Sequence, residues 1–160
     1  MPAMKPKVYI ETTIISYLAA RPSRDLIVAA HQQLTHQWWD TSRASYDLWT
    51  SQEVIGECAK GDPAAAQQRL EVLAKIALAE IGASALDLAR EFVESGAIPQ
   101  EAAEDALHLG IAVTNGMEYL LTWNCRHLAN ARMRSQIDEV CERMGYKPII
   151  ICNPEELLET

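Results

Sequence analysis

Short apolar runs alternate along the chain with longer amphipathic segments. The apolar runs predict five strands, over residues 8–10, 46–49, 78–81, 119–123 and 148–152. The segments between them have helical spacing and predict helices over 13–20, 26–38, 50–60, 63–77, 84–95, 99–115 and 132–144, with a last helical turn from Asn153-Pro154. Such alternation is typical of an α/β sandwich with a mostly parallel sheet.

Residues that start or stop helices support several of these boundaries. Thr50, with Glu53 three places later, is expected to form a capping box. Asp62-Pro63 has the sequence of a capped helix start. Gly96 and Gly145 follow two predicted helices and are typical helix ends.

Length and composition favour one ordinary globular domain. The chain has 160 residues, of which 49% are hydrophobic, enough to bury a core. It contains no internal repeat or long linker, so we expect a single domain over residues 1–160, with a core of about 7–152. No stretch approaches the roughly 20 apolar residues that span a bilayer. We therefore expect a cytoplasmic protein without a membrane partner.

The four cysteines do not form a recognisable framework. Cys58, Cys125, Cys141 and Cys152 are far apart, with no CxxC pair and no histidines at zinc-finger spacing. We expect mostly buried, reduced thiols. The formal net charge of -8 argues against a general polyanion binder. It does not exclude a nucleic-acid substrate, because metal ions among acids can make the local field positive.

Acidic and amide side chains stand at one expected edge of the sheet. Glu11 follows the first strand and Asn124 follows the fourth. Glu57 lies one turn after Glu53 on the helix that follows the second strand, and Asp105 lies in the first turns of a later helix. Ligands of open parallel sheets bind beyond the carboxyl ends of the strands. Glu11, Glu57, Asp105 and Asn124 are therefore expected to converge.

Converging carboxylates indicate a divalent cation. Two like charges about 4 Å apart repel by roughly 4 kcal/mol at an effective dielectric near 20. Magnesium and manganese prefer oxygen ligands and are commonly held by one or two carboxylates plus substrate phosphates. Such an ion activates a water molecule and neutralises charge on a leaving oxygen, chemistry that suits phosphodiester hydrolysis.

Four stretches of the sequence together resemble a known family. VYIETTIISYL, TSQEVIGECAKGD, EDALHLGIAV and YLLTWNCRHLANA resemble, in that order, the landmarks of PIN domains, and in particular the VapC-type toxin ribonucleases. The resemblance extends from Val8 to about Ile151. It implies a PIN-like three-layer α/β/α sandwich with a mostly parallel central sheet.

The resemblance also implies a function. It implies an endoribonuclease that uses Mg²⁺ or Mn²⁺, with both its catalytic residues and its metal ligands at Glu11, Glu57, Asp105 and Asn124. It further implies homodimers and, where the domain is a toxin of a toxin-antitoxin pair, an antitoxin protein that covers the active-site groove.

Two residues depart from the family pattern. The first acid is usually Asp, and the extra methylene of Glu11 moves the carboxylate by roughly 1.5 Å. The fourth position is often Asp, and Asn124 supplies a neutral oxygen instead. We therefore expect at most one firmly bound ion and weak activity.

Each of these residues also has a purely structural alternative. Glu11 can cap the helix that follows it, and Asp105 can be a favourable charge near a helix N-terminus. Either Glu53 or Glu57 can be the ligand, with the family pattern favouring Glu57. Asn124 can be a turn residue after its strand.

Residues beside the acids suggest supporting roles. Thr12, Thr13 and Thr122 are candidates for orienting ligands, although each can equally be a strand-end hydroxyl. Arg126 and His127 are candidates for a phosphate contact.

His108 lies four residues after Glu104 and three after Asp105, a spacing that lets an acid and an imidazole bind one ion. The carboxylate-x-x-His pattern of di-iron bundles requires a second copy, which this sequence lacks. A hydrogen-bonded or structural histidine is therefore favoured. Trp38, Trp39 and Trp49 are expected in the core or a dimer contact rather than as base-stacking surfaces.

The leading interpretation is a metal-dependent endoribonuclease that hydrolyses RNA phosphodiester bonds with metal-activated water. The alternative is a catalytically weak or inactive PIN domain that binds RNA or a protein partner. A metal-dependent phosphatase acting on small phosphate esters is a third possibility.

Overall fold

A five-stranded parallel sheet forms the centre of the molecule. The computed structural model describes residues 4–159. The strands of this part of the chain are β1 (Lys7–Ile10), β2 (Asp47–Thr50), β3 (Ala77–Leu78), β4 (Tyr119–Leu121) and β5 (Ile150–Cys152), in the order β3-β2-β1-β4-β5. All four pairings among them are parallel, so the carboxyl ends of the strands share one edge.

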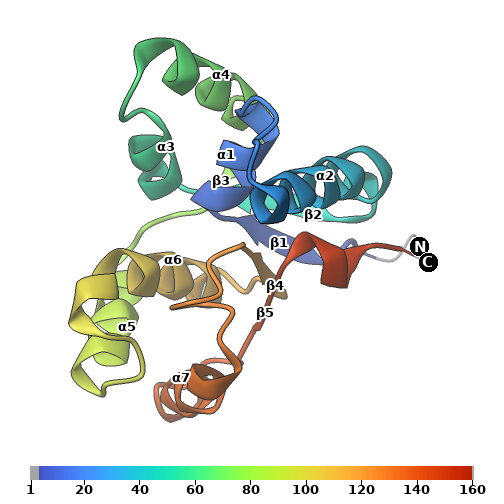
Figure 1. The fold of residues 1–160 in the computed structure, drawn as a ribbon. Helices are drawn as coiled ribbons and strands as arrows, with labels where there is room; N and C mark the ends of the chain where they lie inside the picture. The colour runs from blue at the N-terminus through green and yellow to red at the C-terminus, as the bar shows by residue number, and fades with distance from the viewer. Residues whose placement is uncertain (1–3, 160) are drawn as a thin grey trace.

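Helices cover both faces of the sheet (Figure 1). On one side lie α1 (Thr12–Ala19), α2 (Leu26–Thr41), α3 (Gln52–Cys58) and α4 (Pro63–Leu73). On the other side lie α5 (Ala83–Glu94), α6 (Ala103–Thr114) and α7 (Ala131–Arg143). Short 3-10 turns occur at η1 (Arg43–Ser45), η2 (Gln100–Ala102) and η3 (Pro154–Leu157). The arrangement confirms the predicted three-layer α/β/α architecture, with a sheet that is parallel throughout.

The central strands are buried on both faces, as a parallel sheet between helices requires. Val8, Tyr9 and Ile10 of β1 and Leu120 and Leu121 of β4 have no exposed surface.

Among the helices of residues 4–159, none has both the length and the apolar composition that a membrane span requires. The three cysteines Cys58, Cys141 and Cys152 are buried, and Cys125 is exposed.

The tryptophans fit the expected core role. Trp38 is fully buried, and Trp39 and Trp49 are partly buried against the core. The Arg43 guanidinium lies 4.5 Å from the centre of the Trp39 ring. The Lys7 ammonium lies 5.6 Å from the centre of the Trp49 ring.

Several predicted boundaries are wrong. The third strand, predicted over 78–81, is Ala77–Leu78, and the helix predicted over 99–115 begins at Ala103, after the 3-10 turn η2. Ser51, not Thr50, caps α3, because its hydroxyl accepts from the backbone N–H of Val54 at 3.4 Å. The hydroxyl of Thr50 instead donates to the Ile10 carbonyl at 3.2 Å. The fourth helix ends at Leu73 rather than near residue 77.

Candidate metal centre

The carboxyl edge of the sheet carries the predicted acids. Glu11 directly follows β1, and its backbone N–H donates to the carbonyl of Leu121 at the end of β4 at 3.2 Å. Asn124 therefore lies three residues from the point where β1 and β4 meet. Glu57 is on α3, which follows β2, and Asp105 is in the first turn of α6.

Glu11 is a buried carboxylate with one oxygen fully engaged. Only 4% of the residue is exposed. Its Oε1 accepts from the Thr13 N–H at 3.0 Å, the Thr13 hydroxyl at 2.5 Å and the Thr122 hydroxyl at 2.8 Å. Glu11 thus caps α1, which is the structural role that the sequence analysis gave as its alternative. These hydrogen bonds all use Oε1, so Oε2 is the atom that could bind a cation. Burial raises the pKa of Glu11 above its ordinary value, although the Thr13 hydrogen bond and the nearby His108 oppose this.

Glu57 is held by two donors from other elements. Its Oε1 accepts from His108 Nε2 at 2.7 Å and from the Thr12 hydroxyl. Burial acts to raise the pKa of Glu57, but the hydrogen bond and charge of His108, with the Thr12 hydroxyl, outweigh it and hold the pKa below its usual value. For His108, burial acts to lower the pKa, and Glu57 reverses the effect, so the net direction is upward. Both shifts favour the charged pair, an ionised Glu57 beside a protonated His108 at 2.7 Å.

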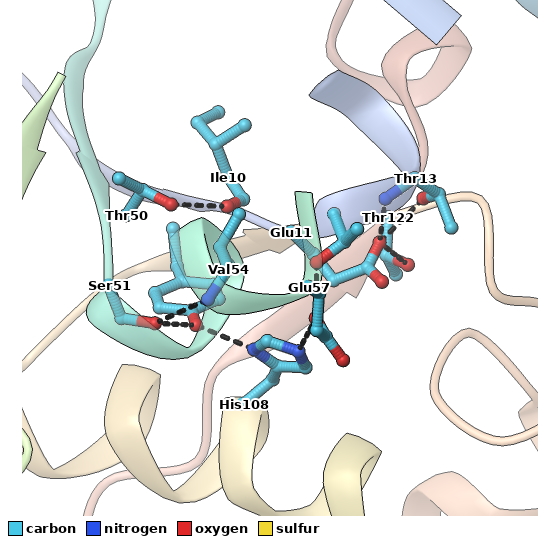
Figure 2. A network of polar contacts seen from close by, with 11 residues as sticks. Ile10, Glu11, Thr13, Thr50, Ser51, Val54, Glu57, His108 and Thr122 are labelled. Atoms are coloured by element: carbon cyan, nitrogen blue, oxygen red, sulfur yellow. Dashed lines mark hydrogen bonds and ion pairs between the residues drawn. The ribbon is translucent and has the colours of Figure 1, made fainter. Parts of the chain in front are cut away.

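His108 is hydrogen-bonded on both ring nitrogens, which confirms the favoured reading of this residue. Its Nδ1 lies 2.7 Å from the Tyr9 hydroxyl, and that hydroxyl lies 2.8 Å from the Ser51 hydroxyl. The network is drawn in Figure 2, where His108 lies between the Ser51 side and Glu57. A buried imidazole without partners would carry a large desolvation cost, and here both nitrogens are satisfied.

Asp105 and Asn124 are brought together by His127. The Asp105 Oδ2 lies 3.3 Å from His127 Nδ1. The Asn124 Oδ1 accepts from the His127 backbone N–H at 3.1 Å, and the Asn124 N–H donates to the Thr122 hydroxyl at 2.9 Å. Asn124 therefore has the turn role that the sequence left open. Arg126 is exposed in the same loop.

Side-chain contacts link three of the predicted residues, and Glu57 has separate partners. Thr122 contacts both Glu11 and Asn124, and His127 contacts both Asn124 and Asp105. Thr12, which contacts Glu57, follows Glu11 in the chain. The four predicted residues thus lie at one edge of the sheet. Glu11, Asn124 and Asp105 are linked through Thr122 and His127, whereas Glu57 is held separately by Thr12 and His108.

Three acids of the described residues form a cluster that differs in part from the predicted one. Within residues 4–159, Glu53, Glu57 and Glu104 each offer an oxygen atom, and these atoms lie within 4.8 Å of one another. Glu57 belongs to the predicted set and Glu53 is its alternative on the same helix, whereas Glu104 enters the sequence analysis only through its spacing from His108. The predicted acids Glu11 and Asp105 are not members of this cluster. The position of Glu104 immediately before Asp105, four residues from His108, was the available signal.

These donors fit a hard divalent cation. Carboxylate oxygens are the ligands that Mg²⁺ and Mn²⁺ prefer. Three carboxylates this close repel one another unless a cation or protons compensate. Neither sulfur nor a pair of free imidazoles accompanies them in the described network, so the donor set does not resemble a zinc site.

Comparison with known proteins supports the fold. No protein-family model matches the sequence, and no curated protein matches it either. Among solved structures, the chain is similar to the crystal structure of VapBC2 from Rickettsia felis bound to a DNA fragment from their promoter. The match has a TM-score of 0.58 and 15% sequence identity, and covers 92% of this chain and 98% of the other. The resemblance to PIN domains is thereby confirmed for the fold: this is a PIN-like α/β structure.

Proposed function

We propose that the protein is a metal-dependent endoribonuclease. The observation that carries this proposal is the gathering of Glu53, Glu57 and Glu104 within 4.8 Å, at the sheet edge where Glu11 and Asp105 also lie. A PIN-like fold with acids at the carboxyl edge suits binding of a cation and a phosphodiester together.

The residues of the chain would hold Mg²⁺ or Mn²⁺ through carboxylate oxygens. Glu57 is the proposed common ligand, with Glu11 and Asp105 contributing from β1 and α6 and Asn124 as an auxiliary donor. When bound, the ion supplies Lewis-acid chemistry: it polarises the phosphate and activates a water molecule. Thr13 and Thr122 fix the Glu11 carboxylate, and Thr12 and His108 fix that of Glu57.

The partners follow from the same proposal. RNA is the proposed substrate, and the net charge of -8 means that its affinity would depend on the bound cation rather than on a basic surface. From the resemblance to VapC-type toxins, we also propose a homodimer and an antitoxin protein as partners. One domain over residues 1–160, with a core of about 7–152, remains the proposed organisation.

The test is RNA cleavage by the purified protein with Mg²⁺, Mn²⁺ or EDTA. We expect internal cleavage of single-stranded RNA with either metal, none with EDTA, and a loss of about 100-fold or more in Asp105→Asn, because a lost ligand removes several kcal/mol of stabilisation. Asp87→Asn is the matched control, since Asp87 is exposed on α5 and pairs with the exposed Arg90 of the same helix. Cleavage that survives both EDTA and Asp105→Asn would contradict the proposal.

One observation favours a second candidate, an RNA-binding module without nuclease activity. The Asn124 Oδ1 is occupied by the His127 N–H, and the Glu11 Oε1 is saturated, so two predicted ligands have fewer free oxygens. RNA retention in a mobility-shift assay without any cleavage in Mn²⁺ would support this alternative. Release of small-ester phosphate with no effect on RNA would instead indicate a phosphatase.

A further inference from the structure

A string of hydrogen bonds, buried except at its last link, runs from the start of α3 to Glu57 (Figure 2). The Ser51 hydroxyl lies 2.8 Å from the Tyr9 hydroxyl, which lies 2.7 Å from His108 Nδ1. The other nitrogen, Nε2, lies 2.7 Å from Glu57 Oε1. Tyr9 and Ser51 have no exposed surface, and His108 has 1%.

The string joins the three elements that carry the acids. Tyr9 is on β1, two residues before Glu11. Ser51 caps α3, the helix of Glu57, and His108 is on α6, one turn after Asp105. The residues in contact are 42, 99 and 51 positions apart in the sequence, so only the folded chain brings them together.

These contacts occupy one of the two carboxylate oxygens of Glu57. His108 Nε2 and the Thr12 hydroxyl both donate to Oε1, from opposite elements α6 and α1. An ionised carboxylate can only accept hydrogen bonds. The Nε2 atom therefore carries a hydrogen, whether the imidazole ring is neutral or protonated. Two donors on one oxygen fix the rotation of the carboxylate, and among the described residues neither of these hydrogen bonds uses Oε2, on a side chain that has Glu53 and Glu104 as neighbours.

We propose that His108 is a positioning residue for Glu57, held in place by Tyr9 and Ser51, so that Glu57 offers a divalent cation a single oxygen, Oε2. This inference rests on the proposed function, because it assumes that Glu57 is a metal ligand. A carboxylate limited to one oxygen favours a small octahedral ion such as Mn²⁺ or Mg²⁺ over Ca²⁺, which takes more oxygens and often both from one carboxylate.

A purely structural histidine would behave differently. Its loss would lower the free energy of unfolding without a specific effect on cation affinity or on the preference between cations. Hydrogen-bonding partners of metal ligands typically change metal affinity by 10–100-fold when removed. Affinity and selectivity therefore separate the two roles.

The experiment measures Mn²⁺ binding by electron paramagnetic resonance titration, with Ca²⁺ as a competitor and without RNA. Tyr9→Phe removes only the hydroxyl that orients His108 and conserves the ring volume. Tyr46→Phe is the matched control, because Tyr46 precedes β2 at the opposite edge of the sheet. We expect about 10-fold or more weaker Mn²⁺ binding in Tyr9→Phe, with a smaller preference for Mn²⁺ over Ca²⁺, and wild-type values in Tyr46→Phe.

His108→Gln provides a second variant, since its amide retains an N–H donor but loses the Tyr9 contact. It is expected to bind Mn²⁺ more weakly than the wild type and more tightly than His108→Leu. Circular dichroism and urea unfolding identify the folded variants to be compared, and the His108 variants decide the outcome if Tyr9→Phe does not fold.

The outcomes also distinguish this inference from the proposed function. Unchanged Mn²⁺ affinity and selectivity in folded Tyr9→Phe or His108→Gln would overturn the positioning role alone. No Mn²⁺ binding by the wild type would overturn both. Weakened binding in the variants, together with a wild type that binds Mn²⁺ but cleaves no RNA, would support the positioning role and contradict the proposed nuclease.

Discussion

Glu11 affects the stability of the fold in two opposite ways: its hydrogen bonds stabilise the fold, and the burial of its charge destabilises it. Its Oε1 caps α1 and binds Thr122 beyond β4, while the carboxylate as a whole is nearly removed from water. Functional sites commonly reduce stability in this way, since a buried charge is kept for binding rather than for folding.

Glu11→Gln should therefore stabilise the metal-free protein at neutral pH. Because burial raises the pKa of Glu11, the ionised form disfavours folding once the pH exceeds the ordinary value of 4.5. We expect the free energy of unfolding in EDTA at about pH 8 to rise by about 1 kcal/mol, as is common when a functional compromise is removed. Urea unfolding measures this change.

The same variant should bind Mn²⁺ more weakly than the wild type. Its stabilisation should shrink below about pH 4.5, where Glu11 of the wild type is protonated in both the folded and the unfolded protein. A Glu11→Gln protein that is less stable than the wild type in EDTA at pH 8 would show that the capping bonds, rather than the buried charge, dominate at this position.

The His108–Glu57 ion pair makes a second prediction at this scale. The pKa of His108 is raised, so its contribution to stability is complete below about 6.5 and is lost as the pH rises through the folded-state pKa. The pKa of Glu57 is lowered, so its contribution is complete above about 4.5 and is lost as the pH falls through the folded-state pKa. The pair therefore stabilises the fold most between these two values.

We expect the difference in free energy of unfolding between the wild type and Glu57→Gln, measured in EDTA, to be larger at about pH 5.5 than at about pH 9. Urea unfolding at the two pH values provides the comparison. An equal difference at both values would mean that the two side chains share a hydrogen bond but no charge interaction.

At the scale of elements, the packing of α5 against α6 places two of the site residues. A Cβ atom added at Gly110 of α6 would lie 2.6 Å from the Ala85 carbonyl oxygen and 3.3 Å from the Ala89 N atom, both on α5. The two helices therefore approach each other at backbone distance. This contact sets the position of α6, which carries Asp105 and His108 toward the sheet edge.

Gly110→Ala should destabilise the protein although alanine is the better helix former. The new methyl group meets backbone atoms that cannot rotate away, and overpacking of this kind costs about 1–3 kcal/mol. Gly56→Ala on α3 is the matched control, because nothing lies within 4 Å of the added atom. There we expect a gain of up to about 1 kcal/mol from helix propensity.

Thermal and urea unfolding of both variants provide the measurement. A Gly110→Ala protein as stable as Gly56→Ala would show that α5 and α6 can separate without cost, and that the position of α6 depends on other contacts.

Local signals in the sequence predicted most elements but not all of their ends. Asp62 caps α4 with Pro63 at its first position, and Gly96 and Gly145 follow α5 and α7 with positive φ, as expected. The fourth helix was predicted too long because residues 77 and 78 pair with β2, Ala77 opposite Trp49 and Leu78 opposite Thr50. That pairing is a tertiary interaction, which helical spacing alone does not encode.

At the scale of the whole molecule, the site could be predicted because its residues follow the ends of the strands. Because the sheet is parallel, residues after β1 and β4 and on the helices after the strands meet at one edge, although they are scattered in sequence. The sequence did not predict the string through Tyr9 and Ser51 or the inclusion of Glu104. Both depend on which way side chains point across elements, information that the order of residues lacks.

Metal binding should stabilise the whole fold. A ligand that binds only the folded protein adds about 2.7 kcal/mol to the free energy of unfolding at 100 times its dissociation constant. We expect Mn²⁺ to produce this increase in the wild type, and EDTA to reverse it. In Glu57→Gln, the same Mn²⁺ concentration should have little effect, and an equal increase in this variant would place the ion elsewhere.

The central claim is that acids from separate elements hold one divalent cation at the carboxyl edge of the sheet. Anomalous diffraction from a crystal soaked in Mn²⁺ tests it most directly. The account predicts a peak at about 2 Å from Glu57 Oε2, within reach of a second carboxylate from Glu11, Asp105 or Glu104. A Mn²⁺-soaked crystal with no peak at this edge, or with a peak that does not involve Glu57, would contradict the account.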